Sequence, residues 1–515
     1  MKRPQLVSAG LLNRMLAGAD EAWARRDFQQ SIELLERASR LDPANTKILL
    51  RLGQSYGWRY QSADAERCFE KAIRLAPNKA EILATAGRLA AELSNPQMAE
   101  RFFRQALEQK NVAPDTVARL AELYERLHRA EDTAAMVERA LHLDNACPLA
   151  RLTQAKLDRQ AGRLVEAEQV LRPALTTADH EMQVRGFYEL GTICDRQGRY
   201  DDAMSAFLEA KTLLQQDAPP LLAQLQLIIG FLKEMQSNVS ADMLARWSDS
   251  AHELLQPLHR LAFLGGHARS GTTLLEQVLD SHPDIVSAEE TTIFHNDVYT
   301  PLRNSQPPGT PMLAGLDTAS LQTLRQARER YFQSMSLCLG HPSGQRLLID
   351  KNPSLQAFIL AFVRFFPEAR LIVALRDPRD VVLSCFMLPH WPISAGSVNY
   401  LNLEDAAAAY CRTMGIWRTL APLLKNPWLE VRYEDMVADL EAVARKSLDF
   451  LGVPWDAKVL GFDDHARKKL VRSPTYADVS QPVYTRARGR WRHYQKYLEP
   501  HLPKLEPFVK AFGYE

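Results

Sequence analysis

The sequence predicts a chain in two parts, a helical repeat array followed by an α/β domain with a central parallel sheet. Small residues recur every 34 positions through the first half of the 515-residue chain. After about residue 258 the pattern changes to short apolar runs separated by helical stretches, and a glycine-containing loop follows the first run. We therefore expect an α-helical solenoid over residues 1–217, a helical connector over 218–257 and an α/β domain over 258–515.

The repeat period is carried by three series of residues. The small residues of the first series are Ala38, Ala72, Ala106, Ala140 and Ala174, and those of the second are Ala19, Gly53, Gly87, Ala121 and Ala155. Large apolar residues stand three positions before the first series, at Leu35, Phe69, Phe103, Val137, Leu171 and Phe207. The small residues continue at Gly191 and Ala210, displaced by two positions, which indicates a short insertion near residues 175–185.

A 34-residue period with two helical patterns in each unit resembles the tetratricopeptide repeat (TPR). About six repeats would span residues 12–217, and one repeat cannot bury its own apolar face, so the units must stack. Such arrays commonly bind peptides or mediate self-association. The resemblance therefore implies a peptide or protein acceptor bound by the array and leaves a homodimer open.

Composition and charge restrict the partners and the compartment. The formal net charge is +1, which gives no reason to expect nucleic acid or an anionic membrane as the main partner. The six cysteines form no C-x-x-C pair, a pattern typical of a reduced, cytoplasmic protein. The N-terminal residues carry no sustained apolar stretch, and no run of about 18 apolar residues occurs, so we expect neither a signal peptide nor a membrane span.

Four apolar runs in the second half predict buried strands. They cover residues 261–264, 346–350, 369–375 and 428–433. Helical patterns separate them, and a helix is expected to begin near Val381, after the third run. Short apolar strands that alternate with helices predict a parallel sheet, in which ligands bind at the carboxyl ends of the strands.

The loop after the first strand predicts a phosphate site. Residues 266–273 follow the P-loop pattern G-x-x-x-x-G-K-[ST], except that Thr272 replaces the lysine. The loop opens a helix, whose N-terminal amides and dipole favour an anion. The missing lysine argues against hydrolysis of a nucleoside triphosphate, and Arg269 could supply the positive charge. A purely structural turn is the alternative.

Three segments together resemble the sulfotransferases that use 3′-phosphoadenosine 5′-phosphosulfate (PAPS). Residues 267–274 are similar to the 5′-phosphosulfate loop of that family. Arg376, at a strand end, and Ser384, eight positions later, are similar to its 3′-phosphate motif. Residues 489–492, Gly-Arg-Trp-Arg, with Arg486 before them, are similar to the late basic segment that closes over the cofactor. The resemblance covers roughly residues 258–495.

Within this family the motifs are closest to the tyrosylprotein sulfotransferases. Residues 281–291 follow the loop as the family's H-P…E-E-T segment does, which places the catalytic base at Glu290 and the catalytic lysine at Lys351. Gln481 stands where those enzymes have a late lysine, and this departure weakens the peptide-tyrosine assignment. His295 is an alternative base, because many other sulfotransferases use a histidine.

The resemblance implies PAPS as co-substrate, no metal, and transfer of a sulfuryl group to an acceptor hydroxyl. The implied catalytic residues are Glu290, Lys351 and Arg269. The implied cofactor-binding residues are His267, Ala268, Arg269, Ser270, Gly271, Thr272, Thr273, Arg376, Ser384, Tyr433, Arg486, Gly489, Arg490 and Trp491. The acceptor is left open between a peptide tyrosine, a sugar, a lipid and a small phenol. A P-loop kinase-like phosphotransferase and a TPR scaffold with a non-catalytic nucleotide-binding domain are the competing functions.

Overall fold

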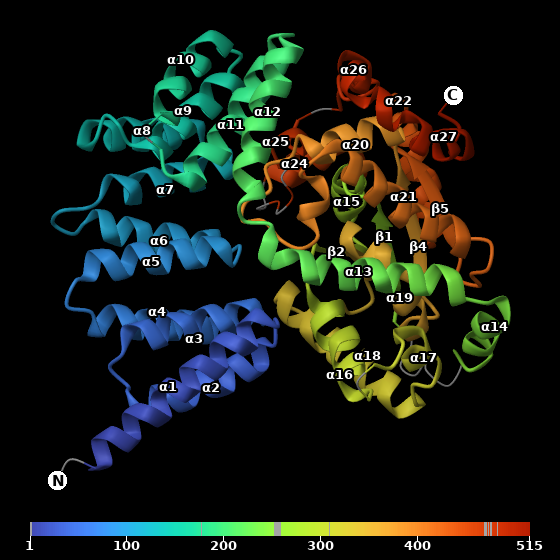
Figure 1. Ribbon diagram of the computed structural model, residues 1–515, viewed down its shortest axis with the longest axis horizontal. Coiled ribbons are helices and arrows are strands. Elements are labelled where there is room, and N and C mark those ends of the chain that lie inside the picture. The colour runs from blue at the N-terminus through green and yellow to red at the C-terminus, as the bar shows by residue number, and fades with distance from the viewer. Residues whose placement is uncertain are drawn as a thin grey trace. The chain divides into compact units, whose positions relative to one another are not determined.

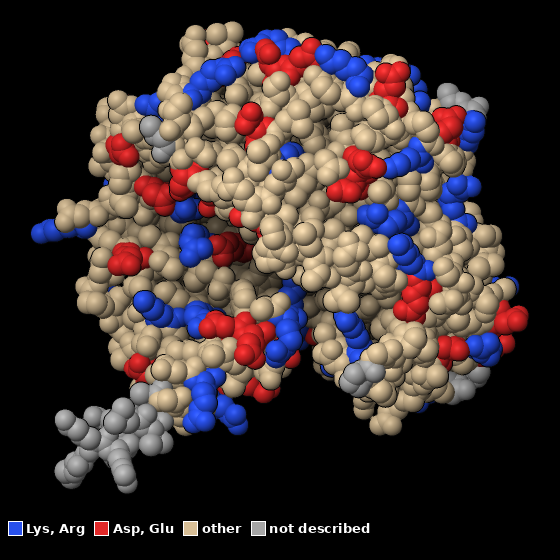
Figure 2. Space-filling view, in the orientation of Figure 1, with Lys and Arg blue, Asp and Glu red and all other residues tan. Residues whose placement is uncertain are grey.

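The computed structural model describes residues 3–176, 178–251, 259–307, 309–467, 471, 473, 476–481 and 483–514. Contacts between residues divide the chain into two compact units, Met1–Ala161 and Gly162–Glu515, and each is described by itself. This division falls inside the helical repeats, so the domain limits predicted from the sequence stay a prediction. Basic and acidic side chains are interspersed over the face shown in Figure 2, in line with the net charge of +1.

The repeat region consists of consecutive helices, drawn in blue to green in Figure 1. Those of the first unit are α1 (Arg3–Ala24), α2 (Phe28–Leu41), α3 (Thr46–Trp58), α4 (Ser62–Leu75), α5 (Lys79–Glu92), α6 (Pro96–Leu107), α7 (Pro114–Arg126), α8 (Ala130–Leu143) and α9 (Pro148–Gln160). Those of the second unit are α10 (Leu164–Leu175), α11 (His180–Arg196) and α12 (Tyr200–Gln215). The helical solenoid predicted from the 34-residue period is therefore confirmed.

The small and the large residues of the repeat period pack against each other inside the repeat hairpins. Ala38, Ala72 and Ala106 have no exposed surface. A methyl group on Gly53 would lie 2.5 Å from the ring of Phe69, and the pairs Gly87–Phe103 and Gly191–Phe207 repeat this close approach at 2.7 and 2.6 Å. The small residues therefore give the large rings of the neighbouring helix the space they need.

The turn inside each repeat hairpin uses a left-handed residue. The positions are Arg26, Tyr60, Ser94, His128, Gly162 and Gly198, all with φ between 58° and 80°. The first five are 34 residues apart, and the last is displaced by the same two positions as the small residues. The period therefore fixes the backbone of the turns as well as the packing of the helices.

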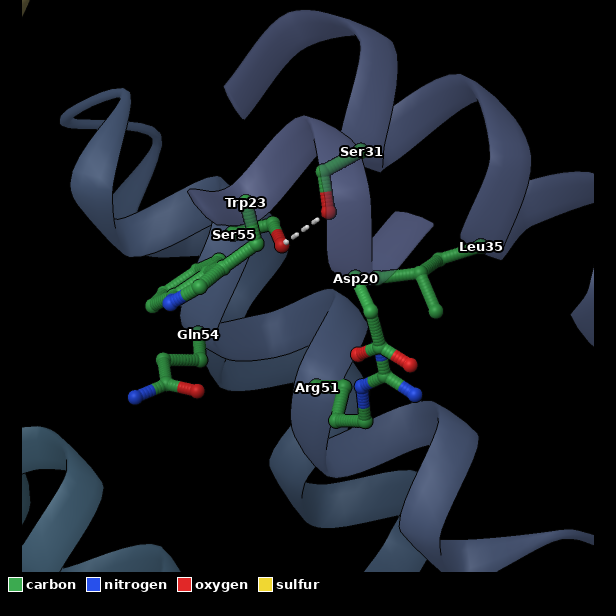
Figure 3. A pocket seen from close by; sticks show the side chains of 7 residues that line it. All are labelled: Asp20, Trp23, Ser31, Leu35, Arg51, Gln54 and Ser55. Carbon is green, nitrogen blue, oxygen red and sulfur yellow. Dashed lines mark hydrogen bonds and ion pairs between the residues drawn. The ribbon is translucent and has the colours of Figure 1, made fainter. Parts of the chain in front are cut away.

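A small polar pocket lies within the first repeats (Figure 3). Asp20 and Arg51 form an ion pair in its lining, and Ser31 Oγ lies 3.2 Å from Ser55 Oγ. Trp23 and Gln54 extend along its other side. The pocket is lined by both charged and aromatic side chains.

The second unit contains a five-stranded parallel sheet in the order β2-β3-β1-β4-β5. Its strands are β1 (Leu261–Gly266), β2 (Ile285–Glu289), β3 (Leu347–Lys351), β4 (Arg370–Leu375) and β5 (Trp428–Arg432). The parallel sheet predicted from the sequence is confirmed, with the four predicted strands inside it. The sequence analysis missed β2, because its apolar run is short and precedes two glutamates.

Helices cover both faces of this sheet (Figure 1). On one face, Ala262 and Leu264 of β1 belong to a buried cluster with side chains of α15 (Thr272–Asp280) and α23 (Leu440–Leu451). On the other face, the ring of Phe263 lies 5.1 Å from that of Phe362 on α19 (Ile359–Phe365). Burial on both sides explains why β1 is apolar throughout its length.

The remaining helices connect these elements or flank the sheet. They are α13 (Pro219–Asn238), α14 (Ala241–Asp249), α16 (Thr300–Ser305), α17 (Met312–Asp317), α18 (Leu321–Leu339), α20 (Pro378–Phe386), α21 (Leu403–Leu420), α22 (Tyr433–Ala438), α24 (Phe462–Arg467), α25 (Tyr476–Val479), α26 (Gln495–Leu498) and α27 (Leu502–Ala511). Short single-turn segments lie at Pro353–Phe358, Ser397–Tyr400, Ala457–Gly461, Arg490–Tyr494 and Glu499–His501, and a π-helix at Phe294–Tyr299. Part of the predicted connector, residues 252–257, lies outside the described residues.

Helix α20 begins earlier than predicted. Its cap is Asp377, whose carboxylate accepts from the amide of Arg379, and Pro378 occupies the first turn. An aspartate cap followed by proline is a strong helix start, so Val381 lies within the helix and not at its beginning. Among the described residues, no helix is both long and apolar enough to cross a bilayer.

Candidate active site

The carboxyl ends of the strands carry predicted site residues. The loop at residues 267–271 follows β1, Glu290 follows β2, Lys351 ends β3, Arg376 follows β4 and Tyr433 follows β5. In a parallel sheet these ends lie along one edge, which is where open α/β sheets bind their ligands. The phosphate loop, Glu290, Lys351 and Arg376 therefore all lie at this edge.

The loop after β1 has a constrained backbone. Gly266 has φ of 122°, and a methyl group there would lie 2.3 Å from the carbonyl oxygen of Ala374. Gly271, which caps α15, has φ of 91° and leaves no room for a methyl group against the ring of Tyr433. Only glycine fits these positions, so the chain turns tightly and presents the first amides of α15 at the strand ends.

Inside this loop the side chains point in different directions. Ser270, Thr272 and Thr273 are buried, and Thr273 donates a hydrogen bond to Ser473 at 3.1 Å. His267 is 2% exposed and lies against the rings of Tyr400 and Tyr410. Burial lowers the pKa of His267 to about 4, so its imidazole is neutral. Its side chain packs in the core, which leaves its backbone as the part available to a cofactor.

Lys351 is the centre of a buried charge cluster. Its ammonium nitrogen lies 2.8 Å from Glu290, 3.2 Å from Glu289 and 3.3 Å from Glu276, and the side chain has no exposed surface. Burial alone would lower the pKa of Lys351. The charges of Glu276, Glu290 and Glu289 outweigh burial and hold this pKa well above its usual value. The lysine is therefore charged and holds three carboxylates together.

Glu290 differs from the other two carboxylates of this cluster. Its side chain is 36% exposed, against 9% for Glu289 and 0% for Glu276. Its backbone is left-handed, with φ of 49°, and its amide donates to the carbonyl of Lys351 at 2.7 Å. A strained residue at a strand end is a common feature of functional sites. Of the three, Glu290 is the carboxylate that an acceptor could reach.

Arg269 joins the loop to the predicted 3′-phosphate motif. Its Nε donates to the hydroxyl of Ser384, on α20, at 3.0 Å, and its backbone has φ of 73°. Arg376 donates from one terminal nitrogen to the carbonyl of Arg269 at 3.2 Å and from the other to the carbonyl of Ala487. The guanidinium of Arg376 also lies over the ring of Tyr433, 4.9 Å from its centre.

The late basic segment is attached to α20 by Asp380. One carboxylate oxygen of Asp380 accepts from the amide of Gly489 at 2.7 Å and the other from the amide of Trp491 at 2.8 Å. The guanidinium of Arg379 lies 4.3 Å above the Trp491 ring. The segment is thereby brought beside Arg376, as the predicted cofactor site requires.

Two basic residues of this segment have partners of their own. Arg490 donates to Asp195 on α11, with its Nε 3.1 Å from the carboxylate. Arg486 lies over the ring of Tyr484, 3.6 Å from its centre. Both were predicted to bind the cofactor, and this role stays a prediction.

His295, the alternative base, lies in the π-helix after β2. Its ring stacks on Tyr299 at 5.5 Å and meets the edge of Phe358 at 6.0 Å. His295 therefore packs against aromatic rings, and its role as an alternative base stays a prediction.

Three residues of the site were missed by the sequence analysis. Glu276 lies on α15 and is buried beside Lys351, and Glu289 accepts from the amide of Ser473 at 3.1 Å. Asp380 holds the late basic segment. A glutamate on the apolar face of a short helix was a signal for Glu276, since such a charge requires a buried partner.

The fold and the site define an α/β domain that combines an anion-binding loop with a buried lysine–carboxylate cluster. Within the described residues, histidine, cysteine, aspartate and glutamate side chains form no group of three or more that could hold a metal ion.

Comparison with known proteins identifies both parts of the chain. Residues 262–457 match the sulfotransferase family, and residues 16–56 and 152–218 match the tetratricopeptide repeat. The chain therefore combines a TPR region with a domain of the sulfotransferase family.

Individual relatives are distant. A protein of Aquifex aeolicus is 24% identical over 375 residues, which cover 67% of this chain and 44% of the relative. Protein-tyrosine sulfotransferase 1 of Danio rerio is 27% identical over 265 residues, which cover 50% of this chain and 72% of the relative. The chain thus spans less than half the length of the first of these relatives. The sulfotransferase domain of the Synechococcus PCC 7002 olefin synthase is 23% identical, with a TM-score of 0.34, and the likeness covers 46% of this chain and 90% of that domain.

Proposed function

We propose that this protein transfers a sulfuryl group from PAPS to an acceptor hydroxyl, with Glu290 as the general base. The observation that carries the proposal is the contact of Glu290 with Lys351, 2.8 Å apart, at the strand ends that also carry the loop of residues 266–273. The match to the sulfotransferase family supports the reaction class.

The residues present suit a doubly phosphorylated nucleotide. Arg376 is buried, and its Nε has no hydrogen-bond partner within the described part of the chain. A buried guanidinium nitrogen without an acceptor is costly and suits a bound anion. On this proposal, Arg376 and Ser384 hold the 3′-phosphate, and Thr272, Thr273 and the loop amides hold the 5′-phosphate. PAPS supplies the sulfuryl group and leaves as adenosine 3′,5′-bisphosphate.

Each residue of the cluster then has a defined task. The acceptor oxygen forms a bond to sulfur as the bond from sulfur to the bisphosphate breaks, and the acceptor's proton passes to the Glu290 carboxylate. Lys351 orients that carboxylate through the 2.8 Å contact. Arg269 and the loop amides offset the negative charge that develops on the leaving oxygen.

We further propose a tyrosine in a peptide or protein as the acceptor, presented by the repeat array. Relatives named protein-tyrosine sulfotransferases match 241–282 residues of this chain. TPR regions commonly bind peptides, and the pocket with Trp23, Gln54 and the Asp20–Arg51 pair is a candidate contact (Figure 3). Gln481 stands in place of the late lysine of those enzymes, so transfer to a tyrosine peptide is the direct test of this acceptor.

The test compares binding and turnover in two variants. Adenosine 3′,5′-bisphosphate should raise the melting temperature of the wild type, whereas ATP with magnesium should not. Glu290→Gln should keep that stabilisation and lose transfer from labelled PAPS to a tyrosine peptide by about 10²–10⁴-fold. Glu441→Gln removes a carboxylate that is 49% exposed in a pair with Arg445 and should behave as the wild type. Stabilisation by ATP alone would indicate a phosphotransferase, and unchanged turnover in Glu290→Gln would point to His295.

A further inference from the structure

The last repeat hairpin, α11–α12, makes direct contact with the segment that the proposed cofactor site needs. Asp195 of α11 accepts from Arg490, with 2.9 Å to a terminal guanidinium nitrogen, and from the hydroxyl of Tyr494 at 2.6 Å. The Asp195 side chain is 14% exposed and that of Arg490 is 28% exposed. One carboxylate of a repeat helix therefore contacts both Arg490 of the late basic segment and Tyr494 just after it.

The same segment is fixed on its other side by α20. Asp380 accepts from the amides of Gly489 and Trp491, and it lies between Arg376 and Ser384 in the chain. Arg490, between these two amides, reaches away from α20 to Asp195. The segment is thus held between two carboxylates, one from the sulfotransferase-family domain and one from the repeat array.

Further contacts make this an interface and not a single bond. The ring of Tyr200, which begins α12, stacks on His493 with centres 4.3 Å apart and planes within 12°. Lys211 of α12 is buried, with its ammonium 4.9 Å from the centre of the Phe386 ring at the end of α20. The hairpin therefore packs on both the late basic segment and the helix that carries Ser384.

A second acidic contact on the hairpin has a different character. Asp201 pairs with Lys496 at 2.7 Å, but the two side chains are 67% and 61% exposed. Exposed pairs contribute little, because water screens them and both side chains lose freedom. Asp195 and Asp201 thus provide a matched comparison within one hairpin.

We propose that Asp195 is a positioning residue for the cofactor site, so that the last repeat hairpin is a functional part of the transferase. By pairing with Arg490 and Tyr494 it holds the backbone of Gly489–Trp491, which follows closely after Ala487, whose carbonyl accepts from Arg376. This inference rests on the proposed function, since it concerns the binding of the doubly phosphorylated nucleotide. It also implies that a partner bound to the array could alter nucleotide affinity through α11.

The test measures binding of adenosine 3′,5′-bisphosphate to full-length Asp195→Asn by titration calorimetry. This variant loses the charge opposite Arg490, and we expect the bisphosphate Kd to rise about tenfold. The KM for PAPS should rise similarly, with the KM for the acceptor unchanged. Asp195→Glu should restore part of the affinity, because it keeps the charge. Asp201→Asn, which removes the exposed carboxylate, should bind as the wild type does.

A second variant, with a smaller change, keeps the test valid if Asp195→Asn misfolds. Tyr494→Phe removes only the hydroxyl that donates to Asp195 and should raise the bisphosphate Kd about threefold, with the circular dichroism spectrum unchanged. Wild-type affinity in both Asp195→Asn and Tyr494→Phe would overturn the positioning role. Equal losses of affinity for the bisphosphate and for the acceptor would also overturn it, since they indicate general damage. Failure of the wild type itself to bind the bisphosphate would refute the proposed function instead.

Discussion

The repeat region and the strand-end site use the same two features, left-handed residues and buried lysines, for different ends. In the repeats, left-handed residues recur at a fixed place in the turn, from Arg26 to Gly198. At the site, the backbones of Arg269 and Glu290 are left-handed, and both residues have proposed roles in transfer. The recurring left-handed residues are therefore part of the architecture, whereas those at Arg269 and Glu290 coincide with proposed functional residues.

Among the described residues, the buried lysines Lys351 and Lys211 differ in the groups that surround them. Lys351 at the site is surrounded by three carboxylates, and its pKa is raised. Lys211 on repeat helix α12 lies between the rings of Tyr188 and Phe386, and burial lowers its pKa to about 7. No hydrogen-bond acceptor contacts its ammonium within the part of the chain that the structure describes. Lys351 therefore neutralises three neighbouring carboxylates, whereas Lys211 is buried among aromatic rings.

Loss of Lys351 should have the largest effect. Lys351→Met leaves Glu276, Glu289 and Glu290 without their cation, and breaking a buried ion pair typically costs about 3–5 kcal/mol of unfolding free energy. Transfer should be lost as well. Denaturant unfolding followed by tryptophan fluorescence measures the cost. Lys504→Met removes an exposed partner of Glu404 and should cost less than about 1 kcal/mol. Similar losses in the two variants would mean that the cluster contributes no more than a surface pair.

Gly266→Ala should have the second-largest effect on the unfolding free energy. The added methyl group meets the backbone oxygen of Ala374 at 2.3 Å in a region of φ that alanine avoids, for a cost of about 2–4 kcal/mol. Bisphosphate binding should weaken with it. Gly162→Ala, at a repeat turn with φ of 80° and open space around the methyl, should cost only about 1 kcal/mol. Equal costs at the two positions would remove the difference between the regions.

Lys211→Met should increase the unfolding free energy, in contrast to the two preceding variants. The folded-state pKa of Lys211 lies near 7, below its ordinary value of 10.5, so the unfolded state binds more protons between these pH values. Wild-type stability should therefore rise with pH from about 7 to about 10 on account of this group. Lys211→Met should add about 1–3 kcal/mol at pH 7 and little at pH 10. A gain that is the same at both pH values would show that Lys211 is charged in the folded protein.

The sequence predicted the helices of the repeat region more completely than the contacts of the strand-end site. Periodicity predicted the repeat helices, because small residues recur opposite large ones, as Gly53 lies against Phe69. The strand-end residues followed from motifs, but their partners did not. Glu276 and Asp195 pair with residues far away in the chain, so the local sequence does not say which residues they contact. Strand β2 was missed because its short apolar run runs directly into Glu289 and Glu290.

The smallest effects should come from glycine at the left-handed positions themselves. Ser94→Gly and Arg269→Gly each relieve a left-handed backbone, with φ of 58° and 73°, at some cost in unfolded-state entropy. The unfolding free energy should change by less than about 1 kcal/mol in both. Their functional effects should diverge, since Arg269→Gly also loses the hydrogen bond to Ser384 and a cation at the loop. Calorimetry should show wild-type bisphosphate affinity in Ser94→Gly and a loss of at least tenfold in Arg269→Gly. If both variants kept full affinity, isolated strain at Arg269 would be architectural, like the strain of the repeat turns.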